Sequence, residues 1–172
     1  MKKFSYWFLL AGTVLMIVVM MRTGAPLTTT ATPQGILNLE FAWNSELAGK
    51  VLIAWTPTPA ADPIAAAKLN TWLDFIFLFF YSFFLCATCM HISTRLQGAF
   101  GRAGLLVAQA ALLAGFFDIL ENAGMLITLS GNVYDNVNLL TAFFSVVKWL
   151  LVLLALLYIV LGGVKLALRK KP

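Results

Sequence analysis

Four long stretches of apolar residues dominate the pattern along the chain, at residues 4–21, 71–91, 104–129 and 139–168. Each mixes Leu, Val, Ala and Phe without the strict alternation of a barrel strand. About 20 such residues cross the hydrocarbon core of a bilayer, where the backbone must satisfy its own hydrogen bonds. The pattern therefore predicts an all-α fold, a polytopic membrane four-helix bundle that forms one domain over residues 1–172.

The segment between the first two stretches carries its own helix signals. Thr32 followed by Pro33 is typical of a helix start, and the TPTP run at residues 56–59 is typical of a stop. We expect an amphipathic helix over residues 33–55, in the first extracytoplasmic loop. Glu40 falls on its apolar side, where a carboxylate is costly without a partner. Glu40 therefore either reaches water at the bilayer interface or points into the top of the bundle.

The remaining connections are short. Asp62 and Pro63 repeat the cap-plus-proline signal, so the second spanning helix is expected to start at Pro63, outside the membrane. Because only a few residues separate the last three apolar stretches, their helices should pack as antiparallel neighbours.

Composition and charge agree with a membrane protein. The chain is 61% hydrophobic and 11% charged, too little charge for the surface of a soluble domain of this size. The net charge is +5, and the basic residues lie mostly near the ends of the predicted helices and in the segments that connect them. Eight basic residues fall on one side of the predicted bundle: Lys2, Lys3, Arg95, Arg102, Lys165, Arg169, Lys170 and Lys171. The other side has Arg22, Lys50 and Lys68. This asymmetry predicts that both termini are cytoplasmic and explains the basic excess without a nucleic-acid partner.

Several polar residues interrupt the apolar stretches, where they are expensive and usually face a bundle interior or cavity. Asp118, Glu121 and Asn122 share one face of the third predicted helix, and Lys148 lies in the fourth. Glu121 and Lys148 both lie ~15 Å below the outer helix ends, at 1.5 Å per residue. We therefore expect an ion pair between Lys148 and Glu121 or Asp118.

The second predicted helix adds Asp74 near its outer end and Tyr81 further along nearly the same line. Glu40, Asp74, Asp118 and Glu121 then give four carboxyl groups against one lysine. They cannot all be ionised in a low-dielectric site, so some hold a proton, or a cation or cationic ligand completes the balance. The alternative is a polar network that only locks the helices together.

These residues support three hypotheses of function. In the first, an acidic intramembrane pocket facing the outer leaflet binds or processes a lipid-like or cationic ligand. Its candidate ligand-binding residues are Glu40, Asp74, Tyr81, Asp118, Glu121, Asn122 and Lys148. In the second, the same groups move protons or cations. In the third, the chain is a structural or accessory subunit of a larger membrane complex. Membrane lipids, and in the third case other subunits, are the expected partners; no cofactor, metal or catalytic residue is assigned.

Cys86 and Cys89 form a CxxC pair, which suggests a thiol oxidoreductase. The pair lies inside an apolar run near the cytoplasmic end of the second predicted helix, and the chain has no further cysteine to relay electrons. We therefore interpret both as small packing side chains.

Four short runs carry a resemblance to a known group of proteins: GILNLEFA at residues 35–42, IAW at residues 53–55, LDF at residues 73–75 followed by Tyr81, and DILEN at residues 118–122. In this order they resemble a widespread, uncharacterised family of small bacterial four-helix membrane proteins with no assigned activity. The similarity covers about residues 35–148. It implies a bacterial inner-membrane location and supplies no reaction.

Overall fold

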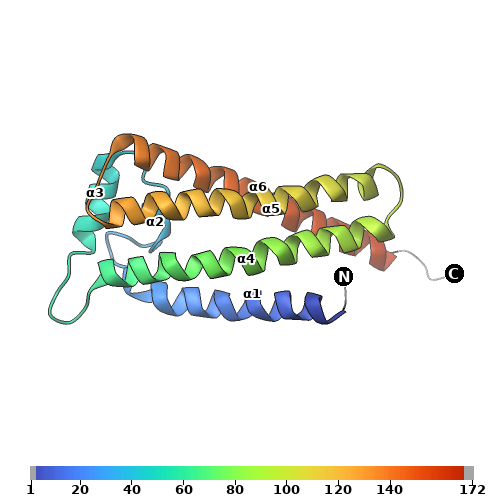
Figure 1. Ribbon diagram of the computed structural model, residues 1–172, viewed down its shortest axis with the longest axis horizontal. Helices are drawn as coiled ribbons and strands as arrows, with labels where there is room; N and C mark the ends of the chain where they lie inside the picture. The colour runs from blue at the N-terminus through green and yellow to red at the C-terminus, as the bar shows by residue number, and fades with distance from the viewer. Residues whose placement is uncertain (1–2, 169–172) are drawn as a thin grey trace.

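Four long helices run side by side in the computed structural model, which describes residues 3–168 (Figure 1). They are α1 (Lys3–Gly24), α4 (Pro63–Arg95), α5 (Gly98–Leu129) and α6 (Asp135–Leu168). Each is long and apolar enough to cross a membrane, which confirms the predicted all-α fold with four candidate spans. The basic residues Lys2, Arg169, Lys170 and Lys171, used above to predict orientation, lie outside the described residues.

The second long helix begins where the sequence indicated. Pro63 is the first residue of α4, and the Asp62 carboxylate accepts a hydrogen bond from the Ala65 amide at 2.9 Å. An N-cap of this kind satisfies a backbone donor that the helix itself leaves free. The prediction of a helix start at Pro63 is confirmed, and α4 extends beyond the predicted stretch at both ends.

The long helices do not pack equally. α4, α5 and α6 pack on one another, as their short connections predicted, whereas α1 packs mainly on α4. Gly12 of α1 allows that approach, because a methyl group there would overlap the ring of Phe80. At the loop end, the Asn70 side-chain amide donates hydrogen bonds to the Met20 carbonyl at 3.0 Å and to the Thr23 hydroxyl at 2.7 Å. α1 is thus fixed to one side of a three-helix unit.

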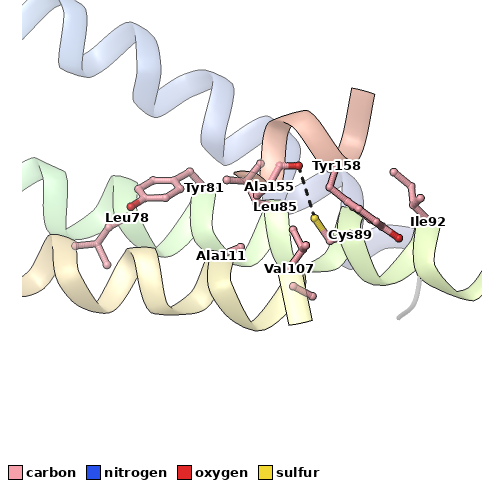
Figure 2. Packing of buried hydrophobic residues seen from close by; sticks show 10 residues of the cluster. Leu78, Tyr81, Leu85, Cys89, Ile92, Val107, Ala111, Ala155 and Tyr158 are labelled. Atoms are coloured by element: carbon pink, nitrogen blue, oxygen red, sulfur yellow. Dashed lines mark hydrogen bonds between the residues drawn. The ribbon is translucent and has the colours of Figure 1, made fainter. Parts of the chain in front are cut away.

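Two apolar clusters fill the interior at different levels. One contains Leu85, Ala111, Ala155 and Tyr158 (Figure 2). It lies toward the end of the bundle at which α1 begins and α6 ends (Figure 1). The other lies at the loop end, around Trp55. Along α5, the buried Asp118 and Glu121 lie between the residues of the two clusters.

The loop differs from its prediction. A single helix over residues 33–55 is wrong: two short helices form instead, α2 (Leu37–Glu40) and α3 (Ser45–Ala54). Thr32 does not cap a helix, because its hydroxyl donates to the Leu27 carbonyl at 2.8 Å and accepts from the buried Trp55 indole at 3.1 Å. Asn44 starts the second helix, since its side chain accepts from the Leu47 amide at 2.8 Å. The predicted stop is confirmed, because α3 ends at Ala54.

Candidate functional site

Lys148 lies at the centre of the buried charges. Its ammonium is 2.8 Å from the Glu121 carboxylate, 3.0 Å from Asp118 and 3.6 Å from Glu40. The lysine is 6% exposed and Glu121 is fully buried. The ion pair predicted from depth along α5 and α6 is therefore confirmed, and one cation serves three carboxyl groups.

Two further groups come from α4. The Tyr81 hydroxyl donates to Asp118 at 2.7 Å, and the Asn122 side-chain amide donates to Asp74 at 2.7 Å. These bonds join α4 to α5 on the face of α5 that carries small residues, where Gly115 packs against Ser82. The small-residue face thus lets the polar side chains of the two helices meet.

Glu40 reaches the same place from outside the long helices. It ends α2, is 7% exposed, and accepts a hydrogen bond from the Trp149 indole at 3.3 Å. The prediction that Glu40 points into the top of the bundle is confirmed, and the alternative in which it reaches water at the interface is wrong. Trp149 was missed, because a tryptophan within an apolar stretch looks like packing; its position next to Lys148 was the available signal.

The structure thus gathers all seven predicted residues in one charged cluster: Glu40, Asp74, Tyr81, Asp118, Glu121, Asn122 and Lys148. They come from α2, α4, α5 and α6, so no single helix contains the site. Whether the cluster binds a ligand stays a prediction. Comparison with known proteins adds no relative. No family model, curated protein or solved structure matches the chain.

A cleft of about 770 Å³ reaches the charged cluster from the side of α1. Its walls are α1 and α6, its floor is α4, and part of the loop lines it at the loop end of the bundle. Apolar side chains line most of it, among them Val14, Ile17, Phe77, Phe84, Val152 and Leu156. Because α1 packs mainly on α4, the space between α1 and α6 is left as a hollow of the size that small-molecule ligands occupy.

The polar part of the cleft is acidic. Glu40, Asp74, Asp118 and Lys148 all line it, but Lys148 already contacts three carboxyl groups. Among these four residues, Asp74 is the one that is only half-buried. Its carboxylate accepts a hydrogen bond from the neutral side-chain amide of Asn122. Within residues 3–168 Asp74 has no salt-bridge partner. A carboxylate in that position attracts a positively charged group.

The two cysteines lie away from this site. Both are free thiols, and Cys89 is fully buried in the apolar cluster of Figure 2, with its sulfur 4.0 Å from the Ala155 carbonyl. This placement supports the interpretation of Cys89 as a packing side chain.

Proposed function

We propose that this protein is an integral membrane protein whose cleft binds a lipid-like amphiphile with a cationic head group. The apolar chain of the ligand lies between α1 and α6, and its head lies against Asp74 and Glu40. The observation that carries the proposal is the half-buried Asp74 carboxylate, which lines an apolar cleft without a salt-bridge partner in the described part of the chain.

The shape of the cleft favours a chain-bearing ligand. A volume of about 770 Å³ falls in the ordinary range for small-molecule sites, and the walls are mostly aliphatic and aromatic side chains. For a ligand that arrives from water, burial contributes roughly 0.8 kcal/mol for each methylene group. A lipid in the bilayer has no water to leave, so recognition depends more on fit and on the head group.

The charges favour a cationic head. Lys148 is held by three carboxyl groups, so it has little remaining capacity for an anionic ligand. A positive head near Asp74 reduces the surplus of negative charge that the cluster otherwise carries. A purely structural network explains the Lys148 ion pairs, but it gives no reason for Asp74 to face the cleft.

The setting completes the proposal. The charge asymmetry described above favours cytoplasmic termini in a bacterial inner membrane, and in that orientation the loop end of the bundle and of the cleft faces the outer leaflet. The loop then lies at the membrane surface, with the exposed Trp43 and Ile53 in contact with lipid.

The test uses protein in lipid nanodiscs and three probes that share a dodecyl chain: dodecyltrimethylammonium, dodecanoate and dodecanol. Native mass spectrometry measures the bound fraction of each. We expect the ammonium probe to bind at least tenfold more tightly than the other two, a difference of about 1.4 kcal/mol. Asp74→Asn should remove most of that preference, because it keeps the shape of the side chain and deletes its charge.

The matched control is Glu46→Gln, an exposed carboxylate of α3 that pairs with Lys50 and lies outside the cleft. It should leave the preference unchanged. Equal binding of the three probes, or an ammonium preference that survives Asp74→Asn, contradicts the proposal.

A further inference from the structure

A buried row of polar side chains extends from the charged cluster to the loop end, along the interface of α5 and α6. Asn138, Thr141, Ser145 and Lys148 recur at intervals of three or four residues, so they share one face of α6. None is more than 6% exposed. Thr128 and Glu121 of α5 face this row, because the Thr128 hydroxyl contacts the Asn138 amide oxygen at 2.9 Å and Glu121 contacts Lys148. We call these six residues the polar seam.

Three atoms of the polar seam lack a hydrogen-bond partner within the described residues. They are the second carboxyl oxygen of Glu121, the Ser145 hydroxyl and the Asn138 side-chain nitrogen. Both Glu121 and Ser145 are fully buried. Buried polar groups in proteins are almost always paired with protein or with ordered water, since an unpaired one loses its hydrogen bonds to water without compensation. Their grouping in one interface points to a shared partner.

The spacing of the polar seam suits water. Successive side chains on the α6 face lie ~4.5–6 Å apart along the axis, given a rise of 1.5 Å per residue. One water molecule spans such a gap by two hydrogen bonds. At Gly124 the two helices approach closely, because a methyl group there would overlap the Thr141 hydroxyl, so this hydroxyl itself continues the polar row at that point.

The polar seam has different surroundings at its two ends. At the loop end, Asp135 and Asn136 begin α6, are exposed, and lie within one turn of Asn138. Beyond Lys148 in the other direction, α6 contributes Ala155 and Tyr158 to the apolar cluster (Figure 2). The polar groups therefore reach the surface at the loop end and stop at an apolar barrier toward the termini.

We propose that the polar seam holds a short file of water and carries protons between the loop end of the bundle and Glu121. One proton enters from water near Asn136, passes along the bridging waters and the hydroxyls of Thr141 and Ser145, and converts the Glu121 carboxylate to the carboxylic acid. No electron moves, and the return step releases the same proton to the same side. The path is independent of amphiphile binding, although it ends at the cluster proposed to recognise the ligand.

Protonation of Glu121 changes the balance of the whole cluster. The charged or titratable groups that share the cluster with Glu121 are Lys148 from α6, Asp118 from α5, Glu40 from α2, and Asp74 and Tyr81 from α4. When Glu121 is neutral, Lys148 has two carboxylates to balance in place of three. The charge presented to the cleft then depends on the proton concentration at the loop end.

Infrared spectroscopy tests this without any ligand. The carbonyl band of a protonated carboxylic acid is followed in nanodiscs during pH titration and during transfer to heavy water, and Glu121→Gln identifies the contribution of Glu121. We expect the double variant Thr141→Val, Ser145→Ala to slow proton–deuteron exchange at Glu121 at least tenfold while its titration midpoint stays unchanged. A purely structural role would shift the midpoint or the stability and leave the exchange rate alone.

The control is Tyr158→Phe, which removes a hydroxyl from the apolar end of the bundle and should not alter the exchange rate. Ser145→Ala alone serves as the milder variant if the double variant does not fold. The proposal is overturned if exchange slows equally in Tyr158→Phe. It is also overturned if only Asp74→Asn slows exchange, because the cleft then supplies the proton. No Glu121 band at any pH at which the protein stays folded is a third contradictory result.

Discussion

The ammonium of Lys148, on α6, holds together carboxyl groups that come from two other helices, α2 and α5. A buried cation with three acidic neighbours differs from a surface ion pair, because removing it leaves several charges without compensation in a medium that solvates them poorly. Removing one of the carboxylates leaves the lysine with two others. The energetic roles of the two partners are therefore unequal.

This asymmetry predicts a ranking of thermal stabilities. Lys148→Met should destabilise the protein strongly, by about 3–5 kcal/mol, and Glu121→Gln by a smaller amount, about 1–3 kcal/mol. The double variant should be more stable than the sum of the two losses predicts, by about 0.5–3 kcal/mol, since it removes one of the charges that Lys148→Met leaves unpaired. Thermal unfolding followed by tryptophan fluorescence measures all three.

Lys50→Met is the matched control, because the Lys50–Glu46 pair is exposed and lies within one helix of the loop. It should leave the unfolding temperature unchanged within error. Strictly additive losses in the two buried-site variants and their double variant would show that Lys148 and Glu121 are not coupled.

The charged residues of this site were open to prediction because ionisable groups within apolar stretches are conspicuous. Asp118, Glu121 and Lys148 could even be paired, since depth along a helix follows from residue count. Trp149 could not be recognised in the same way. Its indole is as suitable for lipid or for packing as for the hydrogen bond that it makes to Glu40.

Helix contacts in this protein depend on glycines where two helices approach closely. Gly124 of α5 faces Thr141 of α6, and an added methyl group would meet the Thr141 hydroxyl. That hydroxyl also bonds the Val137 carbonyl at 2.9 Å, so it is not free to move aside without cost. The α5–α6 interface therefore requires a residue without a side chain at this point.

Gly124→Ala should accordingly destabilise the bundle by about 1–3 kcal/mol, the usual cost of forcing an extra methyl group into a packed interface. Gly163→Ala in α6 provides the comparison, because a methyl group there meets nothing within 4 Å. It should be neutral or slightly stabilising, since alanine favours a helix interior by up to about 1 kcal/mol over glycine. Equal unfolding temperatures for the two variants would contradict the proposed close approach.

The elements themselves were predictable to different degrees. The three long helices after the loop have strong apolar patterns and short connections, so both their existence and their packing could be anticipated. The loop was harder. Its cap-plus-proline signal at Thr32 and Pro33 is local, whereas Thr32 actually bonds to Trp55, more than 20 residues away. A tertiary contact of that kind overrides a cap signal, and residue spacing does not reveal it.

The arrangement of the whole molecule explains why a cleft exists. A closed four-helix bundle would pack α1 against both α4 and α6, and it would cover the acidic groups from every side. Here α1 packs mainly on α4, and the cleft occupies the space toward α6. Apolar periodicity tells which face of a helix is buried but not which neighbour it meets. For that reason the cleft could be hypothesised from the sequence, whereas its walls could not be assigned.

The orientation of the molecule in the membrane decides which side supplies the ligand and the protons. Both proposals therefore depend on the predicted orientation. In Figure 1 the loop and the α4–α5 turn lie at opposite ends. In a background with Cys86→Ala and Cys89→Ala, we introduce Thr58→Cys in the loop and Gln97→Cys at that turn, both at exposed positions. A membrane-impermeant maleimide applied to cells with a permeable outer envelope should label only the first variant; lysis should expose the second. The reverse pattern would place the acidic cleft toward the cytoplasm, because the helices fix the loop and the turn on opposite sides of any membrane they cross.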